Sequence, residues 1–137
     1  SYLGRVSGPL LDRIDIHVEV PPVDIEELAA AGQQESSEDI RARVVRARAV
    51  QSVRYAGTGI FCNAQLTARL IKEYCPMTED ARKLLTRSIS RLGLSARAFD
   101  RISKVARTVA DMDGADTIAA VHVAEAVQYR SVDRWVK

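Results

Sequence analysis

Two arginines stand where a guanidinium group can act on an anion, and the first of them is Arg13. It follows a Ser-Gly-Pro turn signal and directly precedes a segment of alternating apolar residues. A cation at this place can project from the edge of a sheet toward a neighbouring molecule. The spacing by itself favours a simpler alternative, a surface ion pair with Asp12 or Asp15.

The second arginine, Arg97, follows Ser95 at the start of a predicted helix. A cation there opposes the helix dipole, at a cost of a few tenths of a kcal/mol or more. An anion shared between the helix amides and the guanidinium would offset this cost. An acidic neighbour elsewhere in the fold would do the same, so the residues leave both interpretations open.

The motifs that bind or hydrolyse a nucleoside triphosphate are absent from the sequence. It contains no G-x-x-x-x-G-K-[ST] loop and no apolar run that ends in Asp-Glu. His17 and His122 are interpreted as structural or surface residues. Cys62 and Cys75 have no partner at metal-ligand spacing and are interpreted as free thiols. We therefore expect the chain alone to hydrolyse nothing and to hold no cofactor or metal.

The elements that must position the arginines are predicted to be mostly helices. A period of two over residues 14–20 predicts one half-buried strand, which Pro21 and Pro22 end. Apolar spacing and capping residues predict helices over about 38–54, 64–74, 78–92 and 95–112, and from Asp116 or Thr117 to about 129. Ser36, Thr78 and Ser95 are the predicted N-caps, and Gly93 is a predicted C-terminal glycine.

The predicted fold class is mainly α, a small helical bundle preceded by a strand remnant. A single strand has no partner for its backbone groups in this chain, so we expect residues 1–22 to belong to a larger sheet. Residues 23–37 are interpreted as an acidic linker with one helical turn near Ile25. Residues 38–137 are interpreted as the helical domain.

The predicted helix over 38–54 carries a set of arginines that suggests a different function, a stand-alone helical DNA-binding module. The set comprises Arg41, Arg43, Arg46, Arg48 and Arg54. Helix geometry spreads these side chains over more than one face, and acidic residues lie close by. A solvated helix surface is therefore the favoured interpretation.

The bulk composition fits one soluble domain. The chain has 137 residues, 47% of them hydrophobic and 28% charged, with a net charge of +2. Arginine supplies 16 of the 20 basic residues, which suits bidentate pairing with carboxylate or phosphate, although an Arg-rich helix surface explains it equally. No signal peptide and no apolar run of about 20 residues is present, so we expect a cytoplasmic location without membrane contact.

Several strings of the chain closely resemble the ComM/YifB group of bacterial AAA+ ATPases, which is related to the magnesium-chelatase ATPase subunit. The resemblance is carried by residues 2–20, 63–66, 92–98, 105–111 and 124–130. Only residues 23–37 and 55–62 depart from it. The resemblance implies that residues 1–22 end the ATPase core and that the helices form its C-terminal lid.

The resemblance also assigns roles to the two arginines. It implies that Arg13 is an arginine finger, catalytic toward the nucleotide bound by the adjacent subunit. It implies that Arg97 is the sensor-2 residue, which contacts the γ-phosphate of the subunit's own nucleotide. The full-length protein would then bind ATP and Mg²⁺ and form a homo-oligomeric ring, expected to be a hexamer.

The resemblance further implies DNA as the substrate, in branch migration or in processing of incoming DNA during natural transformation. A chelatase-type role, the insertion of Mg²⁺ into a porphyrin, is the alternative within the same family. No motif of the sequence discriminates between these two roles.

Overall fold

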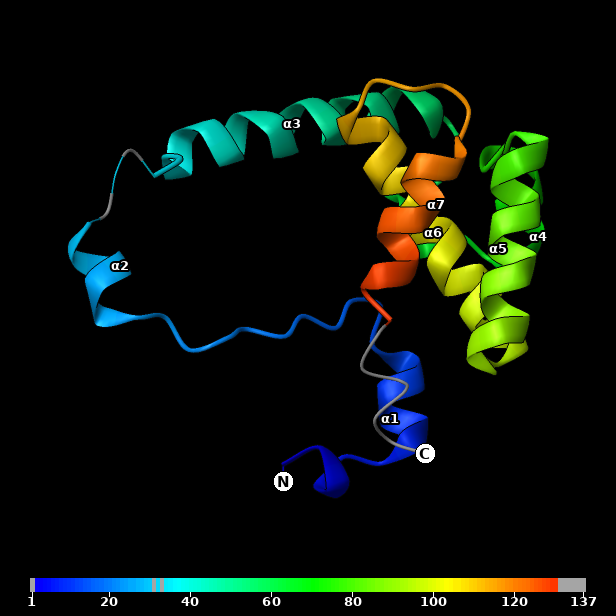
Figure 1. The fold of residues 1–137 in the computed structure, drawn as a ribbon. Coiled ribbons are helices and arrows are strands. Elements are labelled where there is room, and N and C mark those ends of the chain that lie inside the picture. The colour runs from blue at the N-terminus through cyan, green and yellow to red at the C-terminus, as the bar shows by residue number, and fades with distance from the viewer. Residues whose placement is uncertain (1, 31, 33, 131–137) are drawn as a thin grey trace.

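The computed structural model describes residues 2–30, 32 and 34–130, and these residues are mainly helical, as the sequence predicts. Residues 31, 33 and 131–137, which belong to the predicted linker and lid, lie outside the described residues. Helices α5 (Glu79–Leu92), α6 (Ala96–Met112) and α7 (Ala120–Gln128) pack together as the centre of the bundle. Figure 1 shows α3 (Ser37–Arg54) across one end of this bundle and α4 (Ala68–Tyr74) beside α5.

Helix α6 is the core of the bundle because one of its faces consists of small and branched apolar residues. Ala98, Ile102, Ala106 and Ala110 recur at helical spacing and are all fully buried. Their small side chains allow close approach of α5 and α7. Leu85 of α5 and Ile102 of α6 have 0% exposure, which confirms them as core positions.

Local capping signals set several helix ends as predicted. The Ser36 hydroxyl accepts a hydrogen bond from the Asp39 amide at 3.1 Å, and the Thr78 hydroxyl accepts one from the Ala81 amide at 3.1 Å. Gly93 ends α5 with a φ of 61°, in the left-handed region that favours glycine. The predicted turn near Ile25 is helix α2 (Ile25–Ala29).

The predicted strand over residues 14–20 is not formed. No strand occurs there within the described part of the chain, and Val20 is 80% exposed. The segment leaves helix α1 (Gly8–Arg13) as an extended backbone and runs away from the bundle toward α2 (Figure 1). The physical reason is that a strand needs a second strand to pair its amides and carbonyls, and the described residues supply none.

The last helix begins later than predicted, at Ala120 rather than at Asp116 or Thr117. Ile118 instead forms a parallel bridge with Met77, through hydrogen bonds to the Pro76 carbonyl at 2.8 Å and from the Thr78 amide at 3.0 Å. The predicted helix over 64–74 is divided into the 3-10 turn η2 (Asn63–Gln65) and α4, which Thr67 caps. A contact with a distant segment therefore overrides the local signal at Asp116 and Thr117, whereas a local cap at Thr67 divides the other helix.

Candidate nucleotide-facing junction

The C-terminal end of α1 and the N-terminal end of α6 are joined by polar contacts centred on Asp12. The Ser95 hydroxyl donates a hydrogen bond to Asp12 Oδ1 at 3.1 Å. Arg130, whose side chain is 1% exposed, lies 3.6 Å from the same oxygen and also donates to the Ile14 carbonyl. Two hydrogen bonds and one ion-pair contact thus tie residues 12–14 to α6 and to the end of α7.

A second ion pair extends this junction along the chain. Arg101 of α6 contacts Asp15 at 2.6 Å. His17, which is buried, donates its backbone amide to the Tyr129 carbonyl at 2.7 Å, and its ring Nε2 lies 3.1 Å from the Leu11 carbonyl. His17 is therefore structural, as expected, and the start of the extended segment is fixed against the bundle.

Arg13 is exposed at the last residue of α1. The two carboxylates nearest to it in sequence are already engaged, Asp12 by Ser95 and Arg130 and Asp15 by Arg101. Within residues 2–30, 32 and 34–130, no carboxylate forms an ion pair with Arg13. The surface ion pair that the spacing favours is therefore wrong, and the guanidinium is available to a molecule outside the chain.

Arg97 is the second residue of α6 and is also exposed. The first turn of α6 contains no acidic residue, and the Ser95 hydroxyl, which normally would cap the helix, is directed to Asp12 instead. No ion pair holds Arg97 in the described part of the chain. An uncapped positive helix end beside a free guanidinium is a favourable setting for an anion.

The structure therefore brings the two predicted site residues to one junction. The hydrogen bond between Asp12 and Ser95 lies one residue from Arg13 and two residues from Arg97. No metal-binding group of His, Cys, Asp and Glu residues occurs among the described residues. The exposed chemical groups that the junction offers are the guanidinium groups of Arg13 and Arg97.

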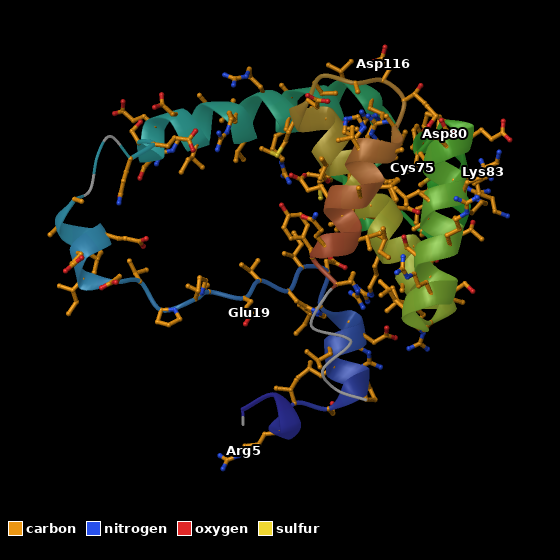
Figure 2. All side chains as sticks on the ribbon, in the orientation of Figure 1. Arg5, Glu19, Cys75, Asp80, Lys83 and Asp116 are labelled. Carbon is orange, nitrogen blue, oxygen red and sulfur yellow. The ribbon has the colours of Figure 1, made fainter. Side chains whose placement is uncertain are left out.

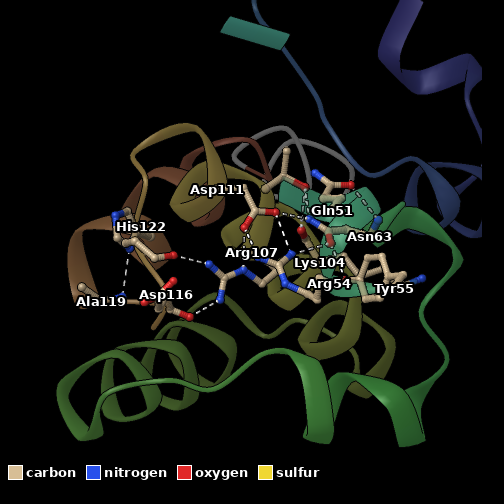
Figure 3. A network of polar contacts seen from close by, with 12 residues as sticks. Gln51, Arg54, Tyr55, Asn63, Lys104, Arg107, Asp111, Asp116, Ala119 and His122 are labelled. Atoms are coloured by element: carbon tan, nitrogen blue, oxygen red, sulfur yellow. Dashed lines mark hydrogen bonds and ion pairs between the residues drawn. The ribbon is translucent and has the colours of Figure 1, made fainter. Parts of the chain in front are cut away.

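Sequence analysis missed a buried polar network between α3, η2 and α6 (Figure 3). Asp111 is its centre, and it accepts hydrogen bonds from Arg54, from Asn63 at 3.0 Å and from Arg107 at 3.1 Å. Arg107 has 0% exposure and also donates to the carbonyls of Ala115 and Asp116. The hydrogen bonds to Asp111 raise the pKa of Arg54 above its usual value, while partial burial opposes them.

The same network continues through Asn63 to α3. The Asn63 side chain accepts hydrogen bonds from Tyr55 and Arg54 and donates one to Thr108. The backbone amide of Asn63 donates to the Gln51 side chain at 3.0 Å. Asn63 and the Arg107–Asp111 pair lie in two of the strings that carry the family resemblance. The spacing of Arg107 and Asp111, four residues apart on one helix face, is the signal that could have predicted the pair.

The arginines of α3 do not form one free surface. Arg54 belongs to the buried network, and Arg43 forms an ion pair with Glu35 at 2.5 Å. His122 is buried, with Nδ1 accepting from the Ala119 amide at 2.9 Å and Nε2 lying 2.8 Å from Asp113. It caps the start of α7 and is structural, as expected.

Comparison with known proteins identifies the family to which these features belong. Residues 34–130 match the family model described as magnesium chelatase, subunit ChlI C-terminal, and residues 1–28 match magnesium chelatase, subunit ChlI. None of the helices in the described residues has both the length and the apolar character that crossing a membrane requires.

Relatives from several bacteria align with nearly the whole chain. YifB of Salmonella typhimurium is 42% identical over 136 residues, which cover 97% of this chain and 26% of the relative. Competence protein ComM of Haemophilus influenzae is 40% identical over 134 residues, with the same coverage of 97% and 26%. An uncharacterized protein of Mycobacterium bovis is 33% identical over 129 residues, which cover 94% and 25%.

The chain thus spans about a quarter of the length of the curated relatives it matches. The buried network includes residues from two strings that carry part of the resemblance, 63–66 and 105–111. The junction includes residues from 8–15 and 95–101. The chain belongs to the magnesium chelatase ChlI family, within its ComM/YifB group.

Proposed function

We propose that this chain is the lid region of an ATP-driven AAA+ motor, together with the segment that carries its arginine finger. In this proposal Arg13 stabilises negative charge on the γ-phosphate of ATP bound by an adjacent subunit, and Arg97 holds a phosphate at the N-terminus of α6. The observation that carries the proposal is the junction itself. It presents two exposed guanidinium groups that form no ion pair in the described part of the chain, and the two carboxylates beside Arg13 are engaged by other residues.

The chemistry of the two arginines supports this role. Phosphoryl transfer is accelerated mainly by positioning and by stabilisation of charge, and an arginine finger contributes about 10³ to 10⁵ in rate in other NTPases. The free first turn of α6 adds oriented backbone amides, which favour phosphate without specificity for the base. The chain covers about a quarter of the length of its longer relatives. In this proposal Mg²⁺ and ATP bind in an ATPase core formed by the remaining part of such a longer protein.

The ring and its substrate are further parts of the proposal. A finger that acts between subunits requires a neighbour, which supports a homo-oligomer, and we propose a hexamer. DNA is the proposed substrate, in branch migration or in processing of incoming DNA. This part is supported by the name of one relative, competence protein ComM, and by the family resemblance.

ATPase measurements on the full-length protein test the roles of both arginines. Arg13→Ala is expected to abolish hydrolysis while ATP binding stays nearly intact, because the finger acts on the neighbour's nucleotide. Arg97→Ala is expected to lower both turnover and nucleotide affinity. Arg41→Ala, which removes an exposed arginine of α3, is the matched control and should change neither quantity. Wild-type turnover in the Arg13 and Arg97 variants would refute the assignment.

Subunit mixing then shows which nucleotide each arginine serves. Arg13 and Arg97 approach one junction, so we propose to test Arg97 for action on the neighbour's ATP as well as on its own. Arg97→Ala subunits are mixed with subunits that carry a disabled nucleotide-binding loop. Recovery of activity in the mixture means that Arg97 acts on the neighbour's ATP, because a mixed interface then joins an intact loop to an intact Arg97. Absence of recovery means that Arg97 acts on the ATP of its own subunit, because neither kind of subunit holds both intact groups.

A further inference from the structure

The outer side of α5 carries a row of basic side chains that the junction does not use. We name the α5 cationic face by its exposed residues, which are Arg82, Lys83, Thr86, Arg87, Ser90 and Arg91. These residues lie opposite the buried Ala81 and Leu85, so they share one side of the helix. Figure 2 shows Lys83 pointing away from the bundle.

The cations of this face lack the partners that hold other arginines of the chain. Lys83 pairs with Glu79 at 2.9 Å, and both side chains are exposed, so the pair is weak. No carboxylate pairs with Arg82, Arg87 or Arg91 among the residues that the structure describes. The acidic residues of α5 are confined to its first turn, at Glu79 and Asp80. The remaining exposed side of the helix is therefore positive and rich in hydrogen-bond donors.

The surface is also hollowed at the centre of this face. Arg82, Lys83, Thr86 and Arg87 line an open depression of about 300 Å³. The walls of this concavity are mostly apolar atoms of these side chains, and the Thr86 hydroxyl donates to the Arg82 carbonyl at 2.9 Å. Contact with an anion is therefore left to the charged ends of the three cations. Guanidinium and ammonium groups of this kind contact phosphate oxygens in nucleic-acid complexes, together with serine and threonine hydroxyls.

The composition of the face distinguishes a nucleic acid from a protein partner. Protein interfaces contain an apolar centre within a polar rim. The exposed large hydrophobic residues of the described chain lie on other segments, and none of them lies on α5. An outer helix surface that carries four cations and no exposed large hydrophobic residue fits a polyanion, whose binding depends on release of counterions from its phosphates.

We infer that the α5 cationic face contacts the phosphate backbone of a nucleic acid, without reading its sequence. The inference rests on the proposed action of the motor on DNA and adds the place of contact. It also moves the DNA hypothesis from α3 to α5. Two of the α3 arginines are engaged by Glu35 and Asp111, whereas the three α5 arginines have no such partners in the described chain.

The test uses the full-length protein and a fluorescent single-stranded DNA oligonucleotide of mixed sequence. The double variant Arg87→Gln with Arg91→Gln removes two exposed cations that form no ion pair in the described part of the chain. Binding is followed by fluorescence anisotropy over a series of salt concentrations. Since each lost phosphate contact changes the slope of log K against log[salt] by about 0.7, the slope should become shallower by about 1.4. Affinity near 0.1 M salt should fall roughly tenfold or more.

The matched control is the double variant Arg41→Gln with Arg48→Gln, which removes the same charge from exposed positions of α3. It should leave the slope and the affinity almost unchanged. Equal losses in the two double variants would overturn the inference, because the effect would then come from net charge alone. Unchanged DNA affinity together with loss of ring assembly, measured by analytical ultracentrifugation, would also overturn it and indicate an acidic protein partner.

The outcome is separable from that of the proposed function. ATP turnover without DNA should be unchanged in the α5 double variant, because its residues lie outside the junction. If Arg13→Ala abolishes turnover while the α5 variant binds DNA normally, only the α5 inference fails. If Arg13→Ala leaves turnover intact, the proposed role of the junction fails whatever the α5 variant does.

Discussion

Two polar regions of this molecule use arginine in opposite ways. In the network around Asp111, the Arg107 side chain is fully buried and each donor group has a partner inside the chain. At the junction around Asp12, Arg130 is also buried and contacts Asp12 and the Ile14 carbonyl, but Arg13 and Arg97 remain exposed. Both regions lie on α6, one near each end of the helix.

The difference shows that the sequence around an arginine does not by itself distinguish a buried arginine with satisfied donors from an exposed arginine without an ion pair. A buried guanidinium is tolerated only when its donors are satisfied, so the partners of Arg107 identify it as structural. An exposed guanidinium beside an uncapped helix end has no structural task that the described chain reveals. The number of satisfied donors therefore separates the two kinds of arginine better than position in the sequence does.

The largest expected effect comes from removing an exposed arginine of the junction. Arg13→Ala in the full-length protein should reduce ATP turnover by about 10³-fold or more, because charge on the transferred phosphoryl group loses its stabilisation. The thermal unfolding midpoint should stay the same, since the side chain is exposed. A steady-state ATPase assay and a thermal melt on the same sample check both statements. A fall in the midpoint with normal turnover would reverse the roles assigned to the two regions.

The next effect concerns the structural side of the comparison. Asp111→Ala should destabilise the fold by about 3–5 kcal/mol, because it leaves two arginines beside a buried site without their carboxylate. Urea unfolding measures the change. Asp80→Ala, which removes an exposed carboxylate from the first turn of α5, is the control and should change stability by about 1 kcal/mol or less. Equal stability of the two variants would show that the network does not hold α3 to α6.

Truncation of a buried apolar side chain gives a reference value for the stability lost when the buried polar network is disrupted. Leu85→Ala or Ile102→Ala should each destabilise by about 2–5 kcal/mol, since both side chains have 0% exposure. Val53→Ala, at an 80% exposed position of α3, should have little effect. The measurement is again urea unfolding, and a cost below about 1 kcal/mol at Ile102 would contradict its central place in α6.

The smallest expected effect is a change of the free energy of unfolding with pH, which arises from two titratable groups near the buried network. Burial raises the pKa of the Cys75 thiol to about 11, and burial also raises the pKa of Tyr55. The folded state therefore retains these protons after the unfolded chain has lost them. Stability contributed by the neutral groups is complete below the unfolded pKa and is lost as pH rises through the folded pKa.

Thermal unfolding of the wild type and of Cys75→Ala between about pH 8 and 11 tests this dependence, a window that begins near the pKa of a free thiol. The wild-type midpoint should fall more steeply with pH than that of the variant. Cys62, which is less buried, should react with a thiol reagent before Cys75 does. Parallel pH profiles for the two proteins would show that the Cys75 thiol is not protected by the fold.

The sequence alone determined the helical class, most helix ends and the family. These features follow from local signals, such as the apolar spacing of α6 and the caps at Ser36 and Thr78, which act within a few residues. It also singled out Arg13 and Arg97. Only the tertiary structure decided which arginines are satisfied, because their partners are distant in sequence. Asp15 meets Arg101 across 86 positions, and Arg54 meets Asp111 across 57.

The same physical reason explains the two wrong expectations about elements. A strand over residues 14–20 requires hydrogen bonds to another strand, and its local alternation cannot supply them. The start of α7 is displaced because Ile118 pairs with Met77, a residue 41 positions earlier by number (118 − 77). Local patterns fix what a segment can form, whereas partners brought together by the fold decide what it does form.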